Sequence, residues 1–270
     1  MGEPRVEEPT EAMIPEQRRE RILSLLEAET VLSVRELTHR LGVSHMTVRR
    51  DIAALVDDGR AKAVKGGVRL TRHLRSEPSY ETKAVAHLEL KRAIATEAAH
   101  RLGDGAAIYL DAGTTVAALV PALLDLTGLT VVTNDFTTLG MLMDHDVELV
   151  HIGGHVESRN RSSIGRLAAA TLRKINVDVA FLSASSWDGR RGVTTPAEAK
   201  VDVKNAALEV ASTSILLADS TKYGTFAMHR IAELQTFDEI ITDDRLGEQT
   251  ATALRAAGVS LTLAGQHSSS

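Results

Sequence analysis

The sequence predicts a winged helix-turn-helix domain of α+β structure, followed by an α/β domain with a mostly parallel sheet. Three observations support this division. Helical periodicity with a glycine turn and a basic strand pair covers residues 16–72, residues 73–80 are aperiodic and contain Pro78, and short apolar runs alternate with helical segments over 81–264. We expect 73–80 to be a linker, and 1–15 and 265–270 to be disordered tails.

The composition is that of a soluble globular protein of the reducing cytoplasm. The 270 residues include no cysteine, which excludes disulfides and cysteine-based zinc sites. No apolar run reaches the roughly 18–20 residues of a membrane-spanning helix, and the acidic, proline-containing start does not resemble a secretory signal. The net charge is −5, but residues 16–75 hold 13 Lys and Arg against 8 Asp and Glu. Such a basic segment is suited to contacting phosphates.

The N-terminal module has the start and stop signals of three helices. The first begins at Glu16. Ser33 is a predicted N-cap of the second helix, with Glu36 as its capping-box partner, and Gly42 ends that helix. Ser44 caps the third. This order of helices and glycine turn predicts a helix-turn-helix.

In the third helix, Val48, Ile52 and Leu55 share one face and are expected to pack inward. After it, residues 60–65 alternate like a strand, Gly66-Gly67 can take the positive φ angles of a tight turn, and 68–70 can return as a second strand. In a major groove the helix would meet base edges, while the wing would reach the backbone. The alternative is a solvated helix face and an ordinary turn. The candidate DNA-binding residues are Ser44, His45, Met46, Thr47, Arg49, Arg50, Lys62, Lys65, Gly66 and Gly67.

These residues resemble a known family. The motif Val43-Ser44-x-x-Thr47-Val48-Arg49-Arg50-Asp51-Ile52, followed by a basic strand and Gly66-Gly67, is similar to the DNA-binding domain of DeoR-type transcription regulators. The family commonly continues with an aromatic residue, a basic residue and a Glu-Lys-x-x-Ile-Ala stretch. This chain has Tyr80, Lys83 and Leu90-Lys91-Arg92-Ala93-Ile94-Ala95, within a predicted long helix from Glu81 to Leu102.

The C-terminal module alternates strands and helices. Strands are predicted at 106–110, 129–133, 147–152, 179–183, 214–218, 239–241 and, more weakly, 259–263; helices are predicted at 115–124, 136–143, 164–174, 197–210 and 248–257. Ligands of such sheets bind outside the carboxyl ends of the strands. There, Gly113 permits close backbone approach, and Thr114 and Thr115 offer hydroxyls and amides to a phosphate or carboxylate. The alternative is a plain threonine helix cap.

Other strand ends carry further candidates, each with a structural alternative. Lys222 could neutralise an anion or be a surface lysine, and Asp219 could hold Lys222, a sugar hydroxyl or a helix N-terminus. In their order, Asp-x-Gly-Thr-Thr, Thr-Asn, Gly-Gly and Asp-x-Ser-Lys-aromatic-Gly resemble the DeoR-type sensor domain, although this chain has Thr221 at the Ser position of the last motif. The resemblance implies a fold like ribose-5-phosphate isomerase and a phosphorylated sugar or polyol as effector. The candidate ligand-binding residues are Asp111, Gly113, Thr114, Thr115, Asn134, Gly153, Gly154, Asp219 and Lys222.

One stretch departs from the family pattern. Where the family has Phe-Ile-Gly-Ala-x-Gly-(Ile/Val)-Asp, residues 181–188 read Phe-Leu-Ser-Ala-Ser-Ser-Trp-Asp. Serine in place of both glycines adds bulk and restricts the backbone. The departure bears on the size and identity of the ligand.

Two other functions remain as alternatives. A sugar-phosphate isomerase would need a carboxylate base and a partner that stabilises the enediolate, for which Asp111, Asp188, Glu198 and Lys222 have suitable side chains. The second domain could also serve oligomerisation alone. We expect no cofactor and no metal, because the histidines are scattered and the pair His151 and His155 lacks helical spacing.

The expected mechanism is that of a repressor. A homo-oligomer, a dimer or tetramer, binds double-stranded operator DNA in its ligand-free state. The effector shifts the sensor domain, and the predicted helix over 81–102 carries the change to the winged helices.

Overall fold

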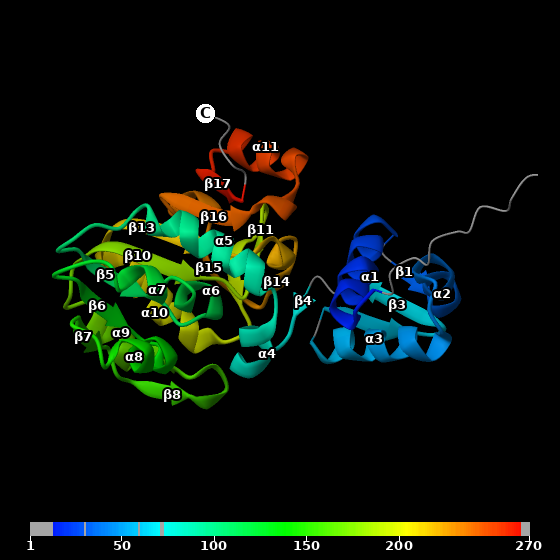
Figure 1. Cartoon of the computed structure of the whole chain (residues 1–270), viewed down its shortest axis with the longest axis horizontal. Coiled ribbons are helices and arrows are strands. Elements are labelled where there is room, and N and C mark those ends of the chain that lie inside the picture. Colours follow the sequence, from blue (N-terminus) through cyan, green and yellow to red (C-terminus); the bar gives the residue numbers. More distant parts are fainter. Residues whose placement is uncertain (1–12, 30, 59, 71–72, 266–270) are drawn as a thin grey trace, which may run out of the picture. The chain divides into compact units, whose positions relative to one another are not determined.

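The computed structural model describes residues 13–29, 31–58, 60–70 and 73–265, and the chain divides into two compact units, residues 1–71 and 72–270 (Figure 1). Most of both predicted tails therefore lies outside the described residues. Within the described part, no helix is long and apolar enough to cross a membrane.

The first unit is a winged helix. It consists of α1 (Pro15–Glu29), β1 (Val31–Ser33), α2 (Val34–Leu41), α3 (His45–Asp57), β2 (Ala61–Val64) and β3 (Gly67–Leu70). The N-caps and the helix end are confirmed: Ser33 accepts from the Glu36 N–H, Ser44 accepts from the Thr47 N–H, and Gly42 ends α2 at φ +64°. Within the described residues the Glu36 carboxylate accepts from Arg40 at 2.9 Å instead of completing the predicted capping box with Ser33. The inward face of α3 is also confirmed, with Val48, Ile52 and Leu55 buried.

The short strand β1 was not predicted, and its presence changes the structural role assigned to Gly67 in the wing turn. β1 pairs antiparallel with β3, so the small sheet has the order β1-β3-β2. Only Gly66 takes a positive φ, at +80°. The prediction that Gly67 does so as well is wrong. A Cβ at Gly67 would lie 2.3 Å from the Leu32 carbonyl oxygen, so this glycine is needed for close approach of two strands.

The second unit is built on a seven-stranded parallel sheet. Its strand order is β17-β16-β13-β10-β5-β6-β7, and every strand corresponds to a predicted apolar run. The bounds are β5 Ala107–Leu110, β6 Thr130–Thr133, β7 Glu148–His151, β10 Val177–Ser183, β13 Ala211–Leu217, β16 Glu239–Asp243 and β17 Leu261–Ala264.

Helices cover both faces of this sheet. One apolar layer packs α5 (Leu88–Ala99), α6 (Thr114–Ala117), α7 (Val120–Leu123) and α8 (Phe136–Leu142) against the sheet. The other packs α9 (Gly165–Leu172), α10 (Glu198–Val210) and α11 (Glu248–Ala256). The predicted single helix over 115–124 is therefore two short helices.

Smaller strands surround the main sheet and were not predicted. They are β11 (Ser186–Asp188), β12 (Gly192–Thr195) and β15 (His229–Ala232) in one antiparallel sheet, the pair β8 (His155–Glu157) and β9 (Ser162–Ile164), and the pair β4 (His73–Leu74) and β14 (Phe226–Ala227). Trp187 lies in β11 and is fully buried. It is thus a core residue and not part of an open loop.

The junction differs from the prediction in two respects. The single helix over 81–102 is wrong: α4 (Tyr80–Val85) and α5 are separated by His87 at φ +54°. The buried Lys91 ammonium stabilises the break between the two helices: it donates to the carbonyls of Lys83 and Ala86, the latter at 2.6 Å. The predicted linker is also wrong, because residues 73–80 belong to the second unit, where β4 pairs with β14.

Candidate functional site

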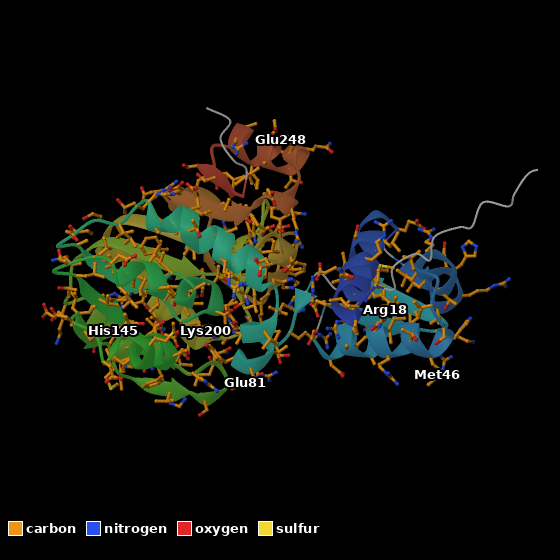
Figure 2. The ribbon with its side chains drawn as sticks, in the orientation of Figure 1. Arg18, Met46, Glu81, His145, Lys200 and Glu248 are labelled. Carbon is orange, nitrogen blue, oxygen red and sulfur yellow. The ribbon has the colours of Figure 1, made fainter. Side chains whose placement is uncertain are left out.

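The exposed face of α3 carries the candidate base-reading residues. His45, Arg49 and Arg50 are exposed, and Met46, at 70% exposure, lies on the outer side of the helix (Figure 2). Thr47 is half-buried, and its hydroxyl lies 3.0 Å from that of Ser44. The arginines and histidine of this face therefore have the freedom that contacts to base edges require.

An ion pair between the half-buried Arg18 and the buried Asp51 positions α3 within its unit. Arg18 of α1 donates through Nε to Asp51 Oδ2 at 2.7 Å and through a second guanidinium nitrogen to Oδ1 at 3.3 Å. Its remaining nitrogen donates to the Met13 carbonyl at 2.6 Å. Asp51 belongs to the motif Thr-Val-Arg-Arg-Asp, so one side of the motif faces outward while Asp51 anchors the helix.

The wing is basic and exposed. Lys62 of β2 pairs in register with Arg69 of β3, and both are exposed, as are Lys65 and Gly66 at the turn. Gly67, in contrast, is buried. Of the predicted wing residues, the two lysines and Gly66 are therefore available to a nucleic-acid backbone, whereas Gly67 shapes the sheet.

In the second unit, the ends of the central strands bring polar residues together. Asp111 follows β5, Asn134 follows β6 and Ser183 ends β10, and these three strands are neighbours in the sheet. All are parallel, so their carboxyl ends share one edge. The sequence prediction that polar groups gather at this edge is confirmed.

A buried ion pair lies at the centre of this edge. The Lys204 ammonium of α10 donates to Asp111 Oδ2 and also to the Ser183 carbonyl at 2.6 Å. Asp111 Oδ2 accepts two further hydrogen bonds from Ser183, at 2.9 Å from its N–H and at 2.7 Å from its hydroxyl. The Asp111 carboxylate is therefore held rigidly by one lysine and one serine.

The loop after β5 is shaped by its neighbours. The Ala112 N–H donates to Asn134 Oδ1 at 2.8 Å, and Asn134 donates to the Ser163 carbonyl at 3.0 Å. A Cβ at Gly113 would lie 2.7 Å from Ser183 Cβ, so the close approach requires glycine. Gly113 itself is the N-cap of α6 and provides no side-chain capping bond, and the buried Thr115 Oγ1 has no hydrogen-bond partner among the residues that the structure describes. The interpretation as a plain threonine cap is therefore wrong.

A second group of charges adjoins Asp111 and Lys204. Glu77, which precedes α4, accepts hydrogen bonds from Lys200 of α10, from Lys83 at 2.7 Å and from Asn160 at 3.3 Å. Lys200 also lies 3.2 Å from Glu157 of β8. Burial alone would raise the pKa of Glu77, but the ammonium groups of Lys200 and Lys83 outweigh it and hold the pKa far below its usual value. Glu77 is thus ionised, as is Lys200, whose pKa is raised by Glu77 and Glu157 in spite of burial.

Residues of both groups line one pocket whose free space of about 10 Å³ is close to that of a single water molecule. Lys200, labelled in Figure 2, projects into the second unit from α10. The pocket combines four charged side chains with amide and hydroxyl groups. It is lined by Glu77, Asp111, Ala112, Asn134, Ser162, Ile164, Ser183, Ser185, Lys200, Val203 and Lys204.

Two of the nine predicted ligand residues, Asp111 and Asn134, line this pocket. Gly113, Thr114 and Thr115 follow the lining residue Ala112 directly in the chain. Glu77, Lys200 and Lys204 were missed. Both lysines occupy the same stripe of α10 as the buried Val203 and Ala207, and lysines within an apolar stripe at i, i+3, i+4 spacing were the available signal.

The remaining predicted residues lie elsewhere. Asp219, fully buried, pairs with Lys222 at 3.1 Å, and although burial would raise its pKa, Lys222 lowers it far below the usual value. The interpretation that Asp219 holds Lys222 is therefore confirmed. Gly153 and Gly154 both have positive φ, and a Cβ at Gly154 would lie 2.8 Å from Ala168 Cβ.

The departures from the family pattern divide into two kinds. Ser186 is buried and shares a 2.7 Å hydrogen bond with Thr194, and the Trp187 indole donates to the Asp219 carbonyl at 3.2 Å. Both therefore support the fold. Ser183, in contrast, lines the pocket.

Of the residues considered for an isomerase, only Asp111 lines the pocket. Asp188 accepts from two backbone N–H groups of its own turn, and Glu198 is exposed at the start of α10. The candidate catalytic set is therefore not assembled.

The two considered histidines do not share a site. His151 Nδ1 accepts from the Gly153 N–H at 3.1 Å, its ring stacks on Phe136, and burial lowers its pKa. His155 is exposed on β8.

Solved structures offer only a weak likeness. Ribose 5-phosphate isomerase A from Methanocaldococcus jannaschii aligns with 50% of this chain and 54% of its own, at 20% identity and a TM-score of 0.37. A likeness at this level carries no argument about the ligand.

Comparisons of the sequence with known families and relatives identify the family of the chain. The model of the DeoR-like helix-turn-helix domain matches residues 18–73, and that of the DeoR C terminal sensor domain matches residues 86–244. The uncharacterized HTH-type transcriptional regulator YgbI of Escherichia coli strain K12 is 43% identical over 93% of this chain and 99% of its own length. The HTH-type transcriptional regulator GlpR of Haloferax volcanii is 33% identical over 92% of this chain and 98% of its own. A putative aga operon transcriptional repressor of Escherichia coli O157:H7 is 31% identical over 93% and 94%. The chain belongs to the DeoR family of DNA-binding transcriptional regulators and is not an enzyme.

Proposed function

We propose that this protein is a cytoplasmic repressor of an operon for sugar or polyol metabolism, and that a phosphorylated sugar or polyol releases it from operator DNA. The observation that carries the effector proposal is the charged pocket at the strand ends, with Lys204 against Asp111 and Lys200 against Glu77. A relative named as a putative aga operon transcriptional repressor agrees with the proposed repression of an operon.

The proposed DNA reader is the outer face of α3 together with the wing. Arg49 and Arg50 are exposed, and neither has a hydrogen-bond or ion-pair partner within the described residues. Arginine binds guanine edges or phosphates through its planar donors. We expect a homo-oligomer, a dimer or tetramer, because one winged helix alone contacts too few base pairs for useful specificity.

Fluorescence anisotropy on DNA from upstream of the protein's own gene tests the reader. Arg50→Ala should weaken specific binding by about 1–3 kcal/mol and relax preference at one base position. Arg166→Ala removes an equally exposed arginine of the second unit and is the control, expected to bind like the wild type. Equal affinities of the wild type and Arg50→Ala for this DNA would contradict the assignment of the reading face.

The pocket supplies the chemistry that a hydroxylated anion needs. Lys200 and Lys204 are donors for an anionic group, while Asp111, Asn134 and Ser183 offer acceptors and donors to hydroxyls. Beside them, the first amides of α6 at Thr114 and Thr115 have no partners within the helix. We propose that the phosphate binds at the lysines and this loop.

Thermal unfolding followed by Trp187 fluorescence tests the effector. Trp187 is the chain's single tryptophan and is buried in the second unit, so its signal reports on the domain that contains the pocket. A phosphosugar at 100 times its dissociation constant should add about 2.7 kcal/mol of stability. No stabilisation across a broad panel would instead favour a domain that serves oligomerisation alone.

A further inference from the structure

The ligand pocket already contains an anion, and that anion belongs to the chain itself. The Glu77 carboxylate lines the pocket and contacts Lys200, Lys83 and Asn160. Its side chain is 14% exposed, against 11% for Lys200 and 16% for Lys83. The Lys200 ammonium is therefore already paired with a carboxylate of the chain.

The charges of the pocket balance without a ligand, and Lys83 and Glu157 beside it add one charge of each sign. Its charged lining residues are two lysines, Lys200 and Lys204, and two carboxylates, Glu77 and Asp111. Each lysine is paired with one of these carboxylates. An anionic ligand entering the pocket unchanged would add negative charge beside two buried carboxylates, which is strongly unfavourable. One of these two carboxylates must therefore leave the pocket when the ligand binds.

Glu77 is the carboxylate that can leave. Asp111 directly follows β5 and accepts from the backbone N–H of Ser183, in addition to two side-chain donors. Glu77 lies in the coil between β4 and α4, and its partners in the described chain are side chains only. It can withdraw without breaking a backbone hydrogen bond of the sheet.

Glu77 also lies on the segment that joins the pocket to the rest of the chain. Residues 73–79, here called the Glu77 segment, are the first described residues of the second unit and lead into α4. The pairing of β4 with β14 and the ring contact of His73 with Phe226 hold the start of this segment. Glu77 supplies its ion pairs, to the pocket residue Lys200 and to Lys83.

We propose that Glu77 is a built-in competitor of the effector: the ligand's anionic group replaces its carboxylate at Lys200 and Lys83, and the freed Glu77 segment transmits binding to the DNA-binding unit. This inference rests on the proposed function. It specifies the ligand as a small hydroxylated anion with a carboxylate or phosphate. It also makes the coupling free energy between effector binding and DNA binding depend on one side chain. The reason is that a ligand shifts a conformational equilibrium only by its difference in affinity for the two states.

Glu77→Gln tests the competition because it keeps the shape and removes the charge. D-ribose 5-phosphate, D-gluconate and neutral D-ribose are titrated into full-length wild type and variant. For one of the two anions we expect the affinity of the variant to be about tenfold or more above that of the wild type, because the state in which the Glu77 carboxylate occupies the lysines disappears. The affinity for D-ribose should not change. The anion that gains identifies phosphate or carboxylate as the recognised group. No gain for either anion, or an equal gain for D-ribose, would overturn the proposal.

Hydrogen exchange of the Glu77 segment supplies the second readout. In the wild type the bound anion should speed exchange in peptides covering 73–79 while protecting those covering 111–115. Glu157→Gln is the matched control: it removes another carboxylate from Lys200, at 3.2 Å, but from strand β8. This variant should retain the anion-induced change at 73–79, whereas Glu77→Gln should lose it.

The two proposals fail in different ways. If anions bind and slow hydrogen exchange in 73–79 as well as in 111–115, Glu77 stays in place. The proposal that the anion displaces Glu77 is then wrong, regardless of the effect of the anion on DNA binding. If the anions compete with Glu77 but never release operator DNA in a parallel anisotropy titration, the competition holds and the proposed effector control is wrong.

Discussion

The buried ion pair of Asp111 and Lys204 gives the sharpest test of the pocket's electrostatics. The side chains are 3% and 5% exposed, so water screens neither charge. Asp111→Asn keeps the shape and removes the negative charge, and breaking a buried pair in this way costs about 3–5 kcal/mol. Lys204 keeps its 2.6 Å hydrogen bond to the Ser183 carbonyl. We therefore expect the lower end of that range, about 3 kcal/mol.

Urea unfolding followed by Trp187 fluorescence measures this loss. The single tryptophan is fully buried in the second unit, so the transition of that unit is followed by itself. With a urea slope of about 2 kcal/mol per molar, the midpoint should fall by about 1.5 M. Asp144→Asn, at an exposed site of the same unit, is the control and should change stability by about 0.5 kcal/mol or less.

A double-mutant cycle separates the pair from its surroundings. Lys204→Met should cost a similar amount, and the double variant should cost clearly less than the two single losses together, with a coupling of about 2 kcal/mol. Additive losses, or a loss below about 1 kcal/mol for Asp111→Asn, would show that the two charges do not depend on each other and would refute the reasoning.

Three further predictions concern other parts of the chain. Lys62→Ala in the wing should lower the slope of log affinity against log salt by about 1, as measured by anisotropy on operator DNA; an unchanged slope would remove Lys62 from the phosphate contacts. Ser183→Gly should cost about 1 kcal/mol by removing the hydroxyl from Asp111, and it should allow larger phosphosugars to stabilise the protein in thermal unfolding; an unaltered ligand profile would contradict Ser183 as a determinant of pocket size. Burial lowers the pKa of Lys91 to about 8, below its ordinary value. The unfolded chain therefore binds more protons between pH 8 and 10, so stability should rise across this range. Urea unfolding should show that Lys91→Met loses this rise, and an identical rise in the variant would be the contrary result.

The winged helix could be predicted almost completely because its signals are local. Ser33, Gly42 and Ser44 act on the residues next to them, and the inward face of α3 follows from its own periodicity. The strands of the main sheet were equally visible as apolar runs. What failed depended on distant partners: β1 forms because β3 lies beside it, and the requirement for Gly67 comes from the Leu32 carbonyl.

The pocket could be predicted only in part for the same reason. Asp111 and Asn134 end strands of a parallel sheet, where topology alone brings them together. Glu77 lies over 120 residues away in sequence from Lys200, in a stretch with no periodic pattern. The break at His87 was equally hidden, because the carbonyls that Lys91 caps become free only once α4 ends.

The most direct test of the central claim is release of the protein from its DNA. Full-length protein is bound to a labelled fragment from upstream of its own gene, and phosphorylated sugars and polyols are titrated in at fixed salt while anisotropy is recorded. We predict that one of them lowers the anisotropy to that of free DNA, and that its neutral parent sugar does not. Specific binding that no member of the panel weakens would contradict the account of the pocket as an effector site.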